Sequence, residues 1–311
     1  MKLPEHVVIK EVGPRDGLQN ERMTVPLEDK IAWINQLSDT GLRYIEATSF
    51  VSPKWIPQLA DAAEVMNGIH RREGVTYSAL VPNLRGLERA LAAGVEEVAV
   101  FMSASETHNR SNINKSIAET FPILQEVTRT ALQAGVKVRG YVSTVFGCPY
   151  EKSVSLRSVM RITDRLLELG VYEVSLGDTI GIANPLQVEH MLEQLLPRFP
   201  QQLALHFHDT RGMALANILL SVQMGVTVFD ASLGGLGGCP YAPGAAGNVA
   251  TEDLVHMLHA MGIVTDIDLN RLLAASGFIQ HKVNTDLPSH MLRVSHEKMD
   301  PHTGHQEERD Q

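Results

Sequence analysis

The feature that most constrains the fold is a regular alternation of β-rich runs with amphipathic stretches. Eight runs are rich in β-branched, aliphatic and aromatic residues, and the segments between them show the apolar spacing of helices. The runs span residues 7–12, 44–50, 75–81, 97–102, 136–145, 172–178, 203–209 and 228–235. Such an alternation is typical of parallel strands joined by helical crossovers.

The segments between the runs carry helix signals of their own. Residues 27–37 and 155–169 have apolar side chains at helical spacing. A glycine often ends a helix because it adopts the left-handed conformation without steric cost. Glycines stand just before the next run at Gly41, Gly94, Gly135, Gly170 and Gly225.

Eight such units predict an α/β protein with a (β/α)8 TIM barrel, which we favour over a doubly wound open sheet. No glycine-rich dinucleotide fingerprint follows the first run, so the open sheet has less support. We expect one catalytic domain over residues 1–295, with extra C-terminal helices in 266–292. Residues 296–311 are polar and are predicted to be a disordered tail, in which His296, His302 and His305 are more typical of a solvated segment than of a metal site.

Composition limits the partners of the chain. The 311 residues carry a net charge of −9 without a block of basic residues, which disfavours binding to nucleic acid or to an anionic membrane. The two cysteines do not form a disulfide framework, and no signal peptide or membrane span is recognisable. A reduced, cytoplasmic protein is therefore expected.

Polar residues with acid–base or ligand capability lie where the predicted strands end, which is the catalytic rim of a TIM barrel. His206 and His208 are two residues apart on one strand, so both can face the mouth. Alone, the pair is also compatible with two hydrogen-bonded core histidines. With Asp16 and Asn248 it forms a nitrogen and oxygen donor set without thiolate, which favours Mg²⁺ or Mn²⁺ over structural zinc.

Three charged residues near this rim are further candidates. Arg15 is either a surface ion-pair partner of Asp16 or a binder of an oxyanion. Glu46 lies within the second run and Asp178 at the end of the sixth, and a carboxylate near a cluster of histidine and arginine can act directly or orient a neighbouring ligand.

The sequence GCPY occurs twice and contains both cysteines. Cys239 lies in GGLGGCPYAPGAAGN (234–248), whose glycines allow a close approach to a ligand. Cys148 has fewer glycines around it, and cysteine is often simply buried. Cys239 is therefore the better candidate for a reactive thiol.

Several of these segments closely resemble 3-hydroxy-3-methylglutaryl-CoA lyases, which belong to a metal-dependent lyase and synthase superfamily built on TIM barrels. The resemblance covers about residues 5–285 in register, and the segments that carry it are VGPRDGLQNE (12–21), EATSFVSPKWIPQLAD (46–61), SLGDTIG (175–181), HFHDT (206–210) and GGLGGCPYAPGAAGN (234–248). The cysteine that eukaryotic members carry near the C-terminus is absent from residues 281–296, so a bacterial-type enzyme is implied.

The resemblance implies a role for each matching position. The metal ligands would be Asp16, His206, His208 and Asn248, and the catalytic residues would be Arg15, Cys239, Glu46 and Asp178. The implied cofactor is a divalent cation, Mg²⁺ or Mn²⁺. The implied partner is an acyl-CoA substrate, with a homo-oligomer expected and no nucleic acid or membrane partner.

The implied reaction is a retro-Claisen cleavage of 3-hydroxy-3-methylglutaryl-CoA to acetyl-CoA and acetoacetate. Three alternatives remain open at this point. The enzyme could cleave a relative with a longer 3-substituent, or it could be a condensing synthase that uses a 2-oxo acid. The third alternative is a barrel that binds a metal or an acyl-CoA without catalysis.

Overall fold

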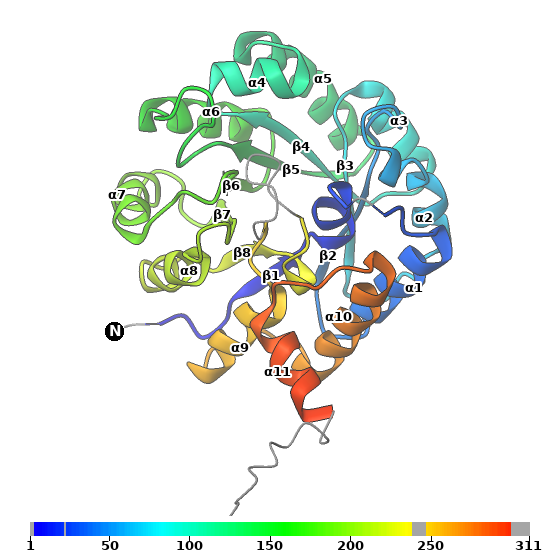
Figure 1. The fold of residues 1–311 in the computed structure, drawn as a ribbon. Helices are drawn as coiled ribbons and strands as arrows, with labels where there is room; N and C mark the ends of the chain where they lie inside the picture. The colour runs from blue at the N-terminus through cyan, green and yellow to red at the C-terminus, as the bar shows by residue number, and fades with distance from the viewer. Residues whose placement is uncertain (1–2, 22, 238–246, 300–311) are drawn as a thin grey trace, which may run out of the picture.

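Eight parallel strands form a closed barrel in chain order, and β8 pairs with β1 to complete the ring (Figure 1). The structure is a computed structural model that describes residues 3–21, 23–237 and 247–299. The strands are β1 (Val8–Glu11), β2 (Tyr44–Ser49), β3 (Thr76–Leu80), β4 (Glu97–Ser103), β5 (Lys137–Ser143), β6 (Val174–Asp178), β7 (Leu203–Phe207) and β8 (Val228–Ala231). The predicted TIM barrel is thereby confirmed, because an open sheet would leave β1 and β8 unpaired.

Helices cover the outside of the barrel, and most strands lead into one helix (Figure 1). They are α1 (Leu27–Ser38), α2 (Ala62–Gly68), α3 (Leu84–Ala92), α4 (Glu106–Ile113), α5 (Ile117–Gln133), α6 (Leu156–Glu168), α7 (Pro185–Leu195), α8 (Ala214–Gln223) and α9 (Thr251–Ala260). The five glycines predicted to end helices all have positive φ, as a left-handed helix terminus requires.

Local sequence explains where a typical helix begins. The Ser155 side chain accepts a hydrogen bond from the backbone N–H of Ser158 and so caps α6. Val159, Ile162 and Leu166 lie on one face of this helix and are buried against the barrel. Helices of this kind gain most of their stability from such an apolar face rather than from intrinsic propensity.

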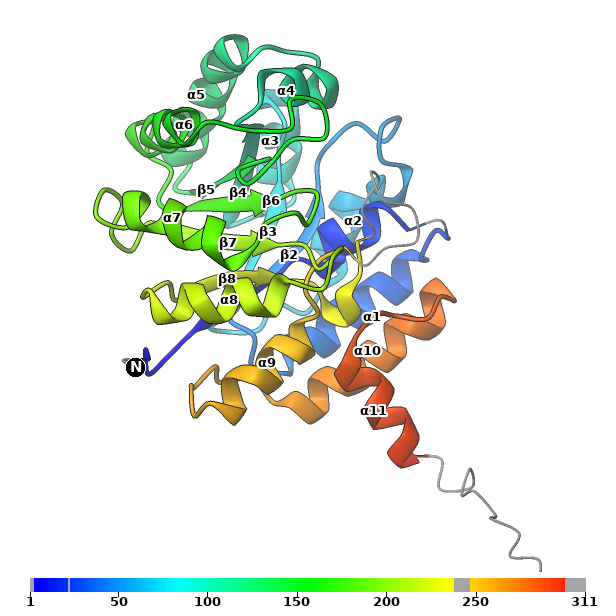
Figure 2. The ribbon, with the colours of Figure 1, turned by 60° about the vertical axis from the view of Figure 1, so that its left-hand side comes forward.

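Two further helices follow the barrel, α10 (Leu269–Val283) and α11 (His290–Met299). α10 packs against α1 and α9, and α11 packs against α9 and α10 (Figure 2). The predicted C-terminal helices are thus present, and α11 extends into the segment predicted as a tail. Residues 300–311 lie outside the described residues.

The two faces of the barrel strands differ in chemistry. The outward side chains join an apolar core with the helices, for example Val98, Val142 and Leu205. The inward side chains include charged groups that contact one another across the barrel, as Arg139 of β5 and Asp230 of β8 do. The apolar core therefore lies between strands and helices, while the centre of the barrel is polar. In the described parts of the chain, no helix has the length and apolarity needed to cross a membrane.

Candidate active site

A short π-helical turn, η1 (Gly13–Gly17), follows β1 and carries Arg15 and Asp16 to the mouth of the barrel. The backbone N–H of Asp16 donates to the carbonyl of Val12 at 2.6 Å. A β-carbon on Gly17 would lie 2.8 Å from Oγ of Ser232, so only glycine fits where this turn meets the segment after β8. The turn is therefore held in place by packing as well as by hydrogen bonds.

The structure brings together the four residues predicted as metal ligands. One donor atom each of Asp16, His206 and His208 lies within 4.8 Å of the others. His206 is on β7, and His208 follows that strand directly and forms an antiparallel bridge with Asn248. The Asn248 Nδ2 group donates to Asp16 Oδ2 and to the Leu236 carbonyl, both at 2.9 Å. Its carbonyl oxygen is consequently the atom with which Asn248 can bind a cation.

The two histidines differ in their surroundings. Nδ1 of His206 lies 3.2 Å from Oδ2 of Asp230, and Nε2 lies 3.8 Å from Oδ2 of Asp16. Nδ1 of His208 is buried and has no hydrogen-bond partner among the described residues. Burial and the neighbouring His206 lower the pKa of His208 to about 4. A neutral imidazole with an unpartnered nitrogen is the form that binds a metal.

Asp16 is ionised at neutral pH. Burial acts to raise its pKa, but Arg15 and the two histidines lower it to about 2. The Gln19 Nε2 group also donates to Asp16 Oδ1 at 2.7 Å. A carboxylate, two imidazole nitrogens and an amide oxygen suit a hard or borderline divalent cation. The residues present therefore fit the metal that the sequence predicts.

Arg15 is enclosed between two carboxylates. Its Nε donates to Glu46 Oε2 at 2.6 Å, and its Nη1 donates to Asp16 Oδ1. The Tyr141 hydroxyl donates to the same Glu46 oxygen at 3.2 Å, and the guanidinium lies 5.2 Å from the centre of the Tyr141 ring. Burial opposes the charge of Arg15, but Glu46 and Asp16 outweigh it and raise its pKa. The structure thus provides a fixed positive charge beside the predicted metal ligands.

Glu46 and Asp178 occupy different environments. Glu46 is fully buried, which raises its pKa, and its Oε1 has no partner among the described residues. Both oxygens of Asp178 accept backbone hydrogen bonds, from Ile182 and Ala183 at 3.0 Å each. Burial raises the pKa of Asp178 to about 6. Glu46 therefore contacts the site directly, whereas the contacts of Asp178 shape the turn after β6.

The two cysteines cannot be compared directly, because Cys239 lies outside the described residues. Cys148 is buried, and its Sγ donates to Oγ of Ser105 at 3.0 Å. The backbone N–H groups of Tyr150 and Glu151 point at the same sulfur at 3.4 Å. Cys148 therefore has the buried, hydrogen-bonded setting that its sequence context favours.

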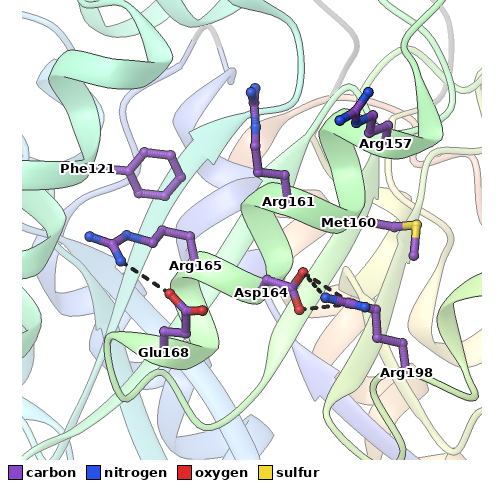
Figure 3. Close-up of a pocket in the computed structure, with 8 residues that line it drawn as sticks. All are labelled: Phe121, Arg157, Met160, Arg161, Asp164, Arg165, Glu168 and Arg198. Atoms are coloured by element: carbon purple, nitrogen blue, oxygen red, sulfur yellow. Dashed lines mark hydrogen bonds and ion pairs between the residues drawn. The ribbon is translucent and has the colours of Figure 1, made fainter.

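A surface groove of about 510 Å³ lies on the outside of the barrel, away from these residues (Figure 3). It contains two ion pairs, Arg198 with Asp164 and Arg165 with Glu168. Its lining consists of Phe121, Arg157, Met160, Arg161, Asp164, Arg165, Glu168 and Arg198. Because none of the predicted site residues contributes to it, the groove is not the candidate active site.

Sequence reasoning missed three residues inside the barrel. Tyr141 donates to Glu46, Asp230 lies 3.2 Å from His206, and Arg139 in turn donates to Asp230. For Arg139 and Asp230 the signal was a charged side chain within a run that otherwise reads as a buried strand, since a buried charge needs a partner. The identity of that partner is not readable from one sequence. Arg139 and Asp230 are 91 positions apart along the chain.

The chain is similar to known proteins over most of its length. Residues 6–279 match the HMGL-like family. The chain is 62% identical over 295 residues to the hydroxymethylglutaryl-CoA lyase YngG of Bacillus subtilis, covering 94% of this chain and 99% of the relative.

Solved structures give the same result. The crystal structure of the Bacillus subtilis HMG-CoA lyase superposes with a TM-score of 0.94 at 61% identity, covering 95% of this chain and 100% of the other. An HMG-CoA lyase from "Acenitobacter baumannii", in complex with coenzyme A and 3-methylmalate, gives a TM-score of 0.89 at 45% identity, covering 93% and 95%. The resemblance noted from the motifs is thereby confirmed, and the chain belongs to the HMGL-like family.

Proposed function

We propose that this protein is a hydroxymethylglutaryl-CoA lyase, which cleaves 3-hydroxy-3-methylglutaryl-CoA to acetyl-CoA and acetoacetate with a divalent cation, Mg²⁺ or Mn²⁺. The observation that carries the proposal is the cluster of Asp16, His206 and His208 beside the buried Arg15 at the mouth of the barrel. The identity to curated lyases over 94% of the chain supports the same reaction.

The proposed cation would be held by Asp16, His206, His208 and Asn248. When bound, it supplies a Lewis acid that makes the C3 hydroxyl of the substrate more acidic and orients the bond to be broken. Four protein ligands would fill only part of an octahedral coordination shell, which would leave positions for substrate oxygens, as an open catalytic site requires. A site of oxygen and nitrogen donors with octahedral coordination favours Mg²⁺ or Mn²⁺.

The residues of the chain have separate tasks in the cleavage. The C3 hydroxyl loses its proton to a base, and the hydroxyl-bearing carbon becomes the ketone of acetoacetate. The electron pair of the C2–C3 bond moves to the thioester carbonyl, whose oxygen becomes an enolate. Arg15 is the counter-charge for that oxygen, because it is the fixed cation at the site. Glu46 holds Arg15 in this orientation through the 2.6 Å hydrogen bond.

The enolate carbon then takes up a proton to give acetyl-CoA. We assign this step to Cys239, because a thiol, with an ordinary pKa of about 8.5, is far more acidic than a hydroxyl, and the surrounding sequence is rich in glycine. We assign Asp178 an indirect role, in which its carboxylate acts through the turn after β6. Its two backbone hydrogen bonds support a positioning role in that turn.

A product assay tests which 3-hydroxyacyl-CoA the enzyme prefers as its substrate. The enzyme is incubated with a panel of 3-hydroxyglutaryl-CoA thioesters that differ in the 3-substituent, and acetyl-CoA release is measured. The methyl compound should give the highest kcat/KM. A longer substituent with the highest value would identify the alternative lyase, and condensation of acetyl-CoA with a 2-oxo acid would identify the synthase. If no thioester is cleaved, the third alternative holds, and the protein binds a metal or an acyl-CoA without catalysis.

A further inference from the structure

A chain of buried charged groups runs from the lower interior of the barrel to His206. Oδ1 of Asp230 accepts from Nη2 of Arg139 at 2.7 Å, and Nη1 of Arg139 lies 3.4 Å from Oδ2. Nε of Arg139 donates to Glu173 Oε1 at 2.7 Å, and Nζ of Lys10 donates to the same oxygen at 2.8 Å. The hydrogen bonds from Arg139, which is itself held by Glu173, therefore fix the carboxylate of Asp230.

The other oxygen of Asp230, Oδ2, also contacts Ser175 and His206. Oγ of Ser175 donates to Oδ2 at 2.6 Å, and Nδ1 of His206 lies 3.2 Å from it. A carboxylate paired with arginine is ionised and can only accept hydrogen bonds. The contact with His206 is consequently a hydrogen bond only if Nδ1 carries the proton. In the neutral form of His206, Nε2, on the side of Asp16, then has a free electron pair.

Among the described residues, His208 has no such partner. Its Nδ1 is buried without a hydrogen bond, and Asp230 contacts His206 instead. The two histidines are thus not equivalent, because within the described structure Asp230 faces Nδ1 of His206 and no group pairs with Nδ1 of His208.

We propose that Asp230, held by Arg139, is a positioning residue that keeps the proton of His206 on Nδ1 and so keeps Nε2 available to bind the divalent cation. A histidine that binds a metal usually donates its other N–H group to a carboxylate or carbonyl, and loss of this partner costs metal affinity. This inference rests on the proposed metal site. It assigns to Arg139 and Asp230 an effect on the metal rather than on packing alone.

Replacing Asp230 with asparagine reverses the tautomer while keeping the shape. Arginine is only a donor, so the new amide must turn its oxygen toward Arg139. Its NH₂ group then faces Oγ of Ser175 and Nδ1 of His206, which both can accept. His206 must accept at Nδ1 and carry its proton on Nε2, where it obstructs the cation.

The test compares Asp230→Asn with Glu173→Gln. Both substitutions remove one carboxylate from Arg139, but Glu173 does not contact a histidine in the described structure. Mn²⁺ binding is measured by electron paramagnetic resonance on variants whose folding is confirmed by circular dichroism. Asp230→Asn should raise the Kd for Mn²⁺ by about 10–100-fold, whereas Glu173→Gln should bind Mn²⁺ as the wild type does. Equal Kd values in the wild type and Asp230→Asn, or an equal loss in Glu173→Gln, would overturn the proposal.

A second measurement uses metal-free protein and does not depend on activity. The ¹⁵N spectrum of histidine-labelled enzyme should show the His206 proton on Nδ1 in the wild type, assigned by its loss in His206→Gln. In Asp230→Asn the proton should move to Nε2. A wild-type proton on Nε2 overturns the inference even if the Asp230 variant does not fold. Failure of the wild type to bind Mn²⁺ at all would instead reject the proposed metal site.

Discussion

Replacing Arg15 with methionine removes the fixed positive charge at the site and retains much of the side-chain length. The guanidinium is the donor that faces both Glu46 and Asp16, and the enolate charge that it is proposed to stabilise exists only during the reaction. Loss of one donor that stabilises such a charge lowers kcat by roughly 10²–10³-fold, or about 2.7–4 kcal/mol. KM should change much less, because the interaction is weak in the ground state.

The same substitution also leaves Glu46 buried with the Tyr141 hydroxyl as its one donor among the described residues. Breaking a buried ion pair in this way costs about 3–5 kcal/mol of folding stability when the remaining group stays charged. Protonation of Glu46 reduces that cost, because burial already raises its pKa. The combined variant Arg15→Met, Glu46→Gln should therefore recover part of the thermal stability but none of the kcat.

The assay follows acetyl-CoA and acetoacetate release at saturating substrate and metal, with thermal unfolding measured on the same preparations. A normal kcat with a raised KM would show that Arg15 is a substrate anchor. Recovery of kcat in the double variant would show that the single variant fails because its fold is disturbed. Either result would refute the assignment of Arg15 to the transition state.

Three other predictions concern the metal, the cysteines and the pH dependence of stability. Chelation should abolish activity and added Mg²⁺ or Mn²⁺ should restore it; full activity in protein shown to be metal-free would reject the metal site. Cys239→Ser should lower kcat by about 10²–10⁴-fold, the range for general acid–base catalysis. Cys148→Ser should keep near-normal kcat, because a hydroxyl can accept hydrogen bonds from the same two N–H groups. If steady-state kinetics show the larger loss in Cys148→Ser, the roles of the two cysteines are the reverse of those proposed. Burial raises the pKa of Glu11 to about 7, above its ordinary value of 4.5, so the folded state holds this proton more tightly. Its stabilising contribution is full below about pH 4.5 and is lost as the pH rises through 7, at up to about 1.4 kcal/mol per pH unit. Glu11→Gln should remove that dependence in urea unfolding series, and an unchanged pH dependence would contradict the shift.

The barrel itself was predictable from the sequence because its signals are local. Each run of the sequence overlaps one observed strand, and the ends differ by a few residues. The largest difference is in the eighth run, where Leu233–Gly235 form a short 3₁₀ turn after β8 instead of extending the strand. Strand ends are set by where barrel pairing stops, which depends on neighbours that are distant in sequence.

The predicted site was recoverable for a related reason. Residues at the carboxyl ends of parallel strands meet at one rim, so Asp16 and His206 could be placed together without knowing the structure. The π-helical form of η1 could not be predicted, since it depends on the contact of Gly17 with Ser232 and on Glu11 accepting the N–H groups of Gly13 and Leu233. The charges inside the barrel were visible as residue types, but their pairing depends on barrel closure.

That pairing has a consequence for how the chain folds. Lys10 is on β1, Arg139 on β5 and Asp230 on β8, and Glu173 stands directly before β6. No contiguous half of the barrel contains every member of this group of charges. The half from β5 to β8 supplies Arg139, Glu173 and Asp230, but Lys10 on β1 reaches Glu173 only when the ring closes. A buried ion without its counter-ion costs several kcal/mol. Partly closed states are thereby penalised relative to the complete ring. The same ions that lie beneath the active site make assembly of the barrel more nearly all-or-none.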